Sequence, residues 1–219
     1  ATELRSGFLI NDGKGKFTFK PMPRIAQIAP GFGMSLADHD GDGNCDLYLV
    51  GNFYTPQVET GFMAGGVSLL LKGDGQGNFT PVEPSESGLV VPGDAKSLTR
   101  IDLNGDRRPD FVVGVNDAAT MVFENQSLQD FVTIRLVGDK GNPTAIGAKV
   151  ILGRSGKILG SAEVTAGTGY LSQDPSSLIF GIGGKNDPIE IEVRWPDGTT
   201  SAKSIAPADG VITIQKEAK

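Results

Sequence analysis

Aspartates occupy alternate positions in the segment 38–46, so that several carboxylates can converge on one point. Ca²⁺ takes six to eight oxygen ligands at about 2.3–2.6 Å, and a tightly turning acidic loop can provide them. Gly43 permits the sharp turn that such a loop needs. An EF-hand would have Glu at its twelfth position, where Leu49 stands, so we expect a calcium loop of another kind. The expected ligands are the side chains of Asp38, Asp40, Asp42 and Asp46 and the backbone carbonyl of Asn44.

The segment 102–110 is a second copy of this loop with two chemical changes. Asn104 replaces one carboxylate with a neutral amide oxygen, and Arg107 stands where the first loop has glycine. Less negative charge and a less relaxed turn predict weaker binding at this second site. The expected ligands are Asp102, Asn104, Asp106 and Asp110. The sequence therefore predicts two Ca²⁺ ions.

Two other interpretations of the loops are open. Asp, Asn and Gly also cap hairpins as ordinary turns that hold no metal. Mg²⁺ binds carboxylates too, but it gives up its water ligands reluctantly and fits all-protein cages poorly. Four carboxylates within the nine residues 38–46 would repel one another without a cation. That repulsion, and the recurrence of the loop in a repeat, favour calcium.

The loops belong to an internal repeat. Residues 8–18 align with 70–80 through the pattern Asp-Gly-x-Gly-x-Phe-Thr, and residues 38–50 align with 102–114. A third copy begins at 121–125 and then stops. Asp-Gly-x-Gly between short apolar runs is typical of hairpins, because glycine supplies the positive φ of tight turns. With no sustained helical period, the repeat predicts β-propeller-type blades.

After Gln129 the sequence changes to a regular alternation of apolar and polar residues, as in 132–136 and 189–195. Strands of this kind bury one face and expose the other, as in an antiparallel sheet or sandwich. We therefore predict an all-β chain. It would comprise partial β-propeller-type blades over residues 1–128 and an antiparallel β-sandwich-like domain over residues 129–219.

Composition disfavours several classes of partner. The net charge of −6 and the pI near 4.8 argue against nucleic acid, whose phosphates would be repelled. No apolar run approaches the roughly 18 residues of a membrane span. The N-terminus does not resemble a signal peptide, so any such segment is expected upstream or already removed. Cys45 is the one cysteine, which leaves no partner for an internal disulfide.

The residue types also argue against catalysis. His39 is the one histidine and lies within the first aspartate loop, at a position expected to point outward, where a Ser-His-Asp or Cys-His mechanism could not share it. Cys45 stands at a strand entrance, where we expect a small buried residue. Paired carboxylates of a glycosidase remain open by residue type, but metal ligation explains the aspartates better. We predict that the chain is not an enzyme.

Both halves resemble known families. The repeats resemble the FG-GAP/VCBS repeats, which are similar to the calcium-bearing propeller blades of integrin α subunits. The C-terminal part resembles the ASPIC/UnbV domain of cartilage acidic protein relatives. The segments that carry this second resemblance are 145–150, 169–173, 180–183 and 193–198.

The resemblance implies an exported, calcium-stabilised propeller protein with a tail domain, located extracellularly, in the periplasm or on the cell surface. The metal loops favour a role as a binding or adhesion module. The resemblance also implies ligand roles at the positions already named and adds Arg108 to the second loop. About two repeats cannot close a ring of roughly four to eight blades, so upstream blades of a longer chain are expected partners, beside a protein or glycan ligand. The alternatives are a structural capping domain and a non-catalytic accessory region of an exported enzyme.

Overall fold

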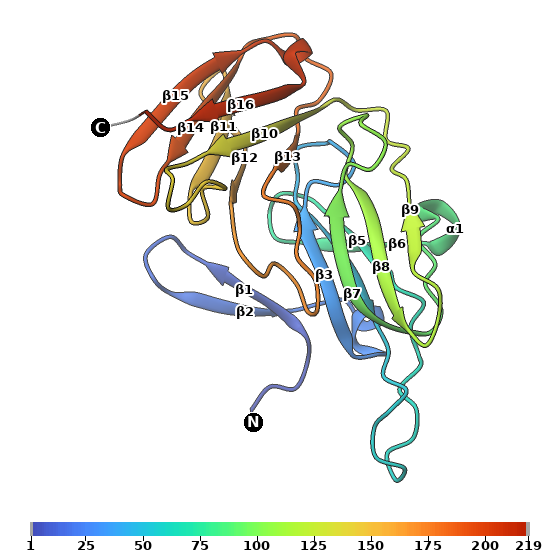
Figure 1. Ribbon diagram of the computed structural model, residues 1–219. Helices are drawn as coiled ribbons and strands as arrows, with labels where there is room; N and C mark the ends of the chain where they lie inside the picture. Colours follow the sequence, from blue (N-terminus) through green and yellow to red (C-terminus); the bar gives the residue numbers. More distant parts are fainter. Residues whose placement is uncertain (1, 218–219) are drawn as a thin grey trace.

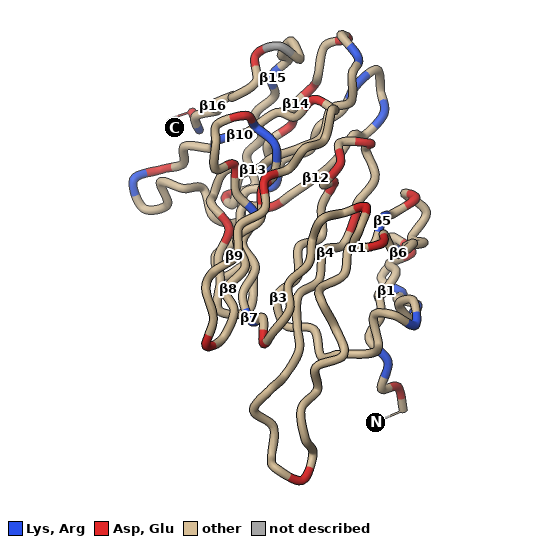
Figure 2. The backbone as a smooth tube through the Cα atoms, turned by 90° about the vertical axis from the view of Figure 1, so that its right-hand side faces the viewer, with Lys and Arg blue, Asp and Glu red and all other residues tan. Residues whose placement is uncertain are grey.

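The computed structural model describes residues 2–217, which form β-strands joined by turns and loops. Figure 1 shows open sheets built from the N-terminal part of the chain beside a sandwich built from the C-terminal residues, and Figure 2 shows the same backbone turned by 90°. Helical structure in the described residues is confined to short segments, none of them long and apolar enough to cross a membrane. These are the 3-10 helices η1 (Arg24–Gln27) and η2 (Pro207–Asp209) and the α-helix α1 (Pro84–Ser87).

Two antiparallel sheets carry the internal repeat, and in each the strands follow one another in chain order. The first repeat sheet contains β3 (Gly31–Ala37), β4 (Asp46–Gly51), β5 (Leu69–Gly73) and β6 (Phe79–Val82). The second repeat sheet contains β7 (Asp94–Ile101), β8 (Asp110–Asn116) and β9 (Met121–Phe123). The aspartate loops join the first strand to the second in each sheet.

The strand registers of the two sheets correspond. Asp46 pairs with Ala37 where β4 begins, and Asp110 pairs with Ile101 where β8 begins. One residue further, Phe111 lies opposite Phe123, as Leu47 lies opposite Leu71. The sequence repeat is therefore also a structural repeat.

The hairpin of β1 (Gly7–Asn11) and β2 (Phe17–Pro21) corresponds to β5 and β6. It forms a separate two-stranded sheet (Figure 1), in which the ring of Phe8 stacks on Phe79 at a centroid distance of 4.3 Å. Leu9 and Phe17 are exposed on it.

The two repeat sheets pack against each other through an apolar core. Tyr48 and Val50 of β4 meet Leu98 of β7 and Phe111 of β8, and the rings of Tyr48 and Phe111 are 4.7 Å apart. The described residues form no closed propeller or barrel. The prediction of an all-β chain with partial blades is therefore confirmed at the level of open sheets.

The C-terminal sandwich consists of two sheets, one with the order β13-β10-β16 and one with the order β12-β11-β14-β15. The prediction of an antiparallel sandwich needs one correction, because β10 and β16 run parallel. Residues 138–210 separate these two strands, which is ample for the chain to return to the same end of the sheet. The strands are β10 (Phe131–Val137), β11 (Lys149–Arg154), β12 (Lys157–Glu163), β13 (Leu178–Gly181), β14 (Ile189–Arg194), β15 (Thr200–Ile205) and β16 (Val211–Gln215).

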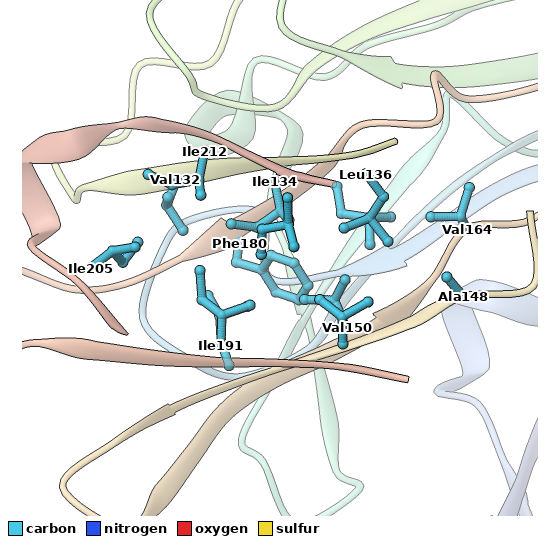
Figure 3. Packing of buried hydrophobic residues seen from close by; sticks show 14 of the residues in the cluster. Val132, Ile134, Leu136, Ala148, Val150, Val164, Phe180, Ile191, Ile205 and Ile212 are labelled. Carbon is cyan, nitrogen blue, oxygen red and sulfur yellow. The ribbon is translucent and has the colours of Figure 1, made fainter. Parts of the chain in front are cut away.

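The sandwich core lies between these sheets, where apolar side chains from both interdigitate (Figure 3). Val132, Ile134 and Leu136 of β10 are buried, as the alternation predicts, and Arg135 is exposed. Thr133 was expected to be exposed as well, yet it is 5% exposed. Thr133 lies on the same face of β10 as Phe131, which is 3% exposed and packs near Gly41 of the first aspartate loop, so the start of this face is covered.

Contacts between distant segments hold the sandwich against the repeat sheets. The loop that precedes β13 runs beside β3 and β7 (Figure 1). There Ser172 Oγ donates to the carbonyl of Leu98 at 2.8 Å, and the backbone N–H of Arg100 donates to Asp174 Oδ1 at 2.8 Å. This contact region between the sandwich and the repeat sheets, called the seam below, lies next to the first aspartate loop.

Candidate metal centre

Three of the predicted ligands converge in the first loop. One carboxylate oxygen from each of Asp38, Asp40 and Asp42 lies within 4.8 Å of the other two. The side chains of Asp40 and Asp42 are 40% and 29% exposed, so solvent reaches the cluster. A cavity of about 410 Å³ also opens beside Asp40, between the two repeat sheets. These oxygens fit a hard divalent cation by their chemistry.

Backbone hydrogen bonds to these same carboxylates explain why the loop folds in this way. Asp38 accepts from Gly41 N at 2.7 Å and from Gly43 N at 3.0 Å. Gly41 and Gly43 have φ of 82° and 90°, where a residue with a Cβ would be strained. Asp40 in turn accepts from the backbone N–H of Asp42 at 3.1 Å. The loop is therefore a chain of side-chain-capped turns.

The second loop repeats this set of hydrogen bonds from backbone N–H groups to loop side chains, which we call the hydrogen-bond frame. Asp102 accepts from Gly105 N at 2.8 Å and from Arg107 N at 2.9 Å, as Asp38 does from its two glycines. Asn104 Oδ1 accepts from Asp106 N at 3.0 Å. Arg107 has a φ of 74°, so this residue adopts the backbone conformation that Gly43 adopts in the first loop. The predicted less relaxed turn is thus present.

The last aspartate of each loop has a different environment from the others. Asp46 is 2% exposed and lies outside the converging group. It accepts from His39 N at 3.1 Å and from Gly73 N at 2.9 Å, which ties the loop to β5. Asp110 is fully buried and makes the equivalent bonds to Leu103 N and Asn125 N, both at 2.8 Å. These two carboxylates hold the frame, and their role as ligands stays a prediction.

Asn44, expected to contribute its backbone carbonyl, and Arg108, which the resemblance adds, both donate their N–H groups within the loops. Asn44 N donates to Asp42 Oδ1 at 2.8 Å, and Arg108 N donates to Asp106 Oδ1 at 2.9 Å. The side chain of Arg108 also contacts Asp106, with Nη1 at 2.8 Å from Oδ2. This ion pair reduces the negative charge of the second loop, in line with the weaker site predicted there.

Lys72 places a positive charge beside the carboxylates of the first loop. Lys72 Nζ contacts the carboxylate of Asp40 and lies 3.0 Å from Asp42 Oδ2. The hydrogen bond to Asp40 is the main cause that raises the pKa of Lys72. Strand register places Glu124 at the equivalent position of the second repeat sheet. The loops therefore differ in their local counter-charge as well as in their ligands.

Burial alters the titration of both loops. It raises the pKa of Asp38 to about 6, and Asp40 and Asp46 add to the rise against the hydrogen bonds from Gly43 and Gly41. In the second loop burial acts in the same direction on Asp106. There the hydrogen bonds from Arg108 and Asn104 outweigh burial and lower the pKa of Asp106.

His39 and Cys45 do not lie where the sequence predicts. His39 is 5% exposed instead of pointing outward, because its ring packs edge-to-face on Phe111 of the second sheet at 5.0 Å. Its Nε2 lies 3.1 Å from the carbonyl of Ser35. Burial, with Arg100 nearby, lowers the pKa of His39 to about 3. Cys45, expected to be buried, is exposed.

One side of the first loop is covered by the segment that connects the repeat sheets to the sandwich. The sandwich itself covers the loop there as well. Asn125 Nδ2 donates to the carbonyl of His39 at 2.7 Å, and Ser127 Oγ donates to that of Asp40 at 2.5 Å. A side chain on Gly181 at the end of β13 would overlap Asp38. Sequence reasoning missed these contacts, because they join segments that lie far apart in the chain.

Comparison with known families bears on the C-terminal part. The family described as ASPIC and UnbV matches residues 138–219. An ASPIC/UnbV domain is therefore present there. It includes β11 to β16, whereas β10 precedes the matched residues. FG-GAP or VCBS repeats are not detected in the chain, and no curated protein matches it.

Proposed function

We propose that this chain is a non-catalytic, calcium-binding β-repeat module of an exported protein, with two Ca²⁺ sites of unequal affinity. The observation that carries the proposal is the convergence of Asp38, Asp40 and Asp42 on a hydrogen-bond frame that recurs in the second loop. Ordinary hairpin turns do not require three carboxylates to face one another, because like charges at this spacing repel.

The charges around the loops support a cation at the first site. Lys72 already contacts two of the three carboxylates, which supports the proposal that these oxygens attract positive charge. Both pairs are partly exposed, so each contributes little, about 0.2–1 kcal/mol. A divalent ion with several oxygen ligands competes well against one ammonium. Ca²⁺ is favoured over Mg²⁺ because a flexible, all-protein oxygen site suits it better.

The same features support a more specific proposal for the family and the role of the repeat sheets. The repeat sheets would be FG-GAP/VCBS-type blades that continue into upstream blades, and calcium would stiffen loops beside a surface for a protein or glycan ligand. Such a module would act outside the cell, in the periplasm or on the cell surface. A second candidate function is structural capping by the sandwich. It is supported by the close packing of Gly41, in the first loop, against Gln129 and Phe131, which lie where the sandwich begins.

A thermal melt in chelator, in millimolar Ca²⁺ and in millimolar Mg²⁺ tests the proposal. At a hundredfold excess over Kd, one site adds about 2.7 kcal/mol of stability, so we expect a marked rise in Tm that is selective for Ca²⁺. Asp40→Ala should remove part of the rise, while Asp187→Ala, an exposed aspartate outside both loops, should retain it. An equal Tm in chelator and in Ca²⁺ would mean that the loops are turns and would overturn the proposal.

Calorimetric titration then separates the two sites. We expect two binding events, with Asp40→Ala weakening the tighter one and Asn104→Ala the weaker one. A single event that survives Asp40→Ala would contradict the assignment of the tighter site to the first loop.

A further inference from the structure

A second cavity lies at the seam between the repeat sheets and the sandwich. It has a volume of about 280 Å³, close to the lower end of the roughly 300–1,000 Å³ of small-molecule sites. Its walls come from β3 and β7 on one side and from β12, β13 and the loop between them on the other. The lining residues used below are Leu36, Arg100, Glu163, Thr165, Thr168 and Asp174.

Arg100 is a cation without an acceptor for its side chain among the described residues. Its Nη1 is buried and makes no hydrogen bond, and no carboxylate oxygen of residues 2–217 lies within 4.0 Å of its guanidinium. The carboxylate of Asp174 lines the same cavity, but its Oδ1 accepts the backbone N–H of Arg100 and not an N–H of the side chain. Burial lowers the pKa of Arg100, against the opposing effects of Asp174, Cys45 and Asp38.

The equivalent position of the first repeat sheet does not hold an arginine. Arg100 pairs with Phe111 as Leu36 pairs with Leu47, so the first repeat sheet has leucine at the equivalent place. A buried charge without an ion partner costs stability, whereas an apolar residue of similar volume would not. Leu36 is 55% exposed and lines the same cavity, so neither of the two residues fills an apolar core there. The guanidinium of Arg100, which has no acceptor among the described residues, is therefore placed to bind a group outside the protein.

We propose that this cavity binds a small monocarboxylate whose other groups are hydrogen-bond donors, with the carboxylate on Arg100. Guanidinium and carboxylate form the strongest paired hydrogen bonds available to such a ligand. Glu163 and Asp174 lie in the same cavity, so they disfavour a phosphate or dicarboxylate and accept from hydroxyl or ammonium groups of the ligand. Thr165 and Thr168 offer further hydroxyls. Sugar acids and amino acids both have this chemistry and this size.

Binding is tested on the full chain in chelator, so that the aspartate loops take no part. The probes are glucuronate with methyl glucoside as its neutral analogue, and L-serine with serinamide as its analogue without a carboxylate. We expect one of the two acids to bind with one-to-one stoichiometry and to shift the NMR amide signals of Arg100, Thr168 and Asp174. Its analogue should bind roughly tenfold to a hundredfold more weakly, the loss expected for a charged hydrogen bond.

Variants locate the site. Arg100→Leu installs the residue of the first repeat sheet and should weaken binding by the same roughly tenfold to hundredfold. Arg24→Leu removes the same charge from an exposed position on η1 and should leave the affinity unchanged. If Arg100→Leu does not fold, Arg100→Gln replaces it in the comparison.

Three results would overturn the proposal. Neither acid binds, or the neutral analogue binds as tightly as its acid, or binding is unchanged in both Arg100 variants. Should neither variant fold, the amide shifts of the unaltered chain decide, and shifts confined to residues away from the seam would also overturn it. Calcium binding is measured separately, so either proposal can fail alone.

Discussion

Gly181 lies directly against the carboxylate of Asp38, although the two residues are in different parts of the fold. A Cβ at Gly181 would overlap Asp38 Oδ2 and the backbone of Gly41. The φ of Gly181 is not positive, so its lack of a side chain serves the close approach and not a special turn. The sandwich and the first aspartate loop therefore fit together without space for even one methyl group.

Gly181→Val should destabilise the chain by about 1–3 kcal/mol, the range for forcing extra atoms into a packed site. The midpoint of urea unfolding measures this loss. Gly184→Val is the matched control, because an added Cβ there meets nothing within 4 Å, and its effect should stay within about 0.5 kcal/mol. Equal midpoints for the two variants would contradict the close fit.

The two kinds of aspartate in the loops should respond differently to amide substitution. In chelator, Asp46→Asn and Asp110→Asn should each cost about 1–3 kcal/mol, because one of two buried backbone N–H groups loses its acceptor. Asp40→Asn should cost within about 1 kcal/mol, since it loses only a half-exposed ion pair. Urea unfolding with and without Ca²⁺ measures both effects. If Asp46→Asn changes only the response to Ca²⁺, Asp46 is a ligand and not part of the frame.

Much of this fold is predictable because its signals are local. The Asp-Gly-x-Gly turns and the offset between the two loops mark the repeat, and its register follows from them. Alternation in 189–195 likewise predicts the buried face of β14. In both cases the residues that set the structure are neighbours in the sequence.

The rest of the site depends on contacts between distant segments. The burial of His39 requires Phe111 of the other sheet, and Leu103, its equivalent in the second loop, is 46% exposed because no described sheet covers that side. Arg100 is a single arginine in a strand, and its meaning appears only once Asp174 and the sandwich are placed beside it. No local pattern could have indicated either arrangement.

Lys72→Met should tighten Ca²⁺ binding at the first loop. Lys72 contacts Asp40 and Asp42, so a metal ion must displace its ammonium. Two partly exposed pairs are worth roughly 0.2–1 kcal/mol each, together about 0.4–2 kcal/mol, which corresponds to a gain in affinity of about twofold to about thirtyfold. Calorimetric titration measures the gain, and Lys203→Met on β15 is the exposed control. Weaker binding in Lys72→Met would show that the lysine supports the site instead of competing for it.

His39 and Asp38 should give the stability of the metal-free chain opposite dependences on pH. The pKa of His39 falls to about 3 on folding, from an ordinary value of 6.5. Below pH 6.5 the unfolded chain therefore takes up a proton that the folded chain refuses, and stability falls by up to about 1.4 kcal/mol per pH unit. The pKa of Asp38 rises to about 6, so its contribution is present at low pH and is lost as the pH rises through 6.

His39→Leu should remove the first effect and leave the second. Leucine is the residue at the equivalent position of the other loop, and the loss of the bond to Ser35 changes the level of stability but not its slope. In chelator, we expect the variant to become more stable as the pH is lowered from 7 to 5, and to gain more than the unaltered chain, in which His39 opposes the carboxyls of Asp38 and Asp46, whose pKa values are raised by burial. Asp38→Asn should show the reverse, losing stability over the same interval. Urea unfolding at half-unit steps of pH measures all three chains, and parallel curves for His39→Leu and the unaltered chain would mean that His39 does not titrate as its burial requires.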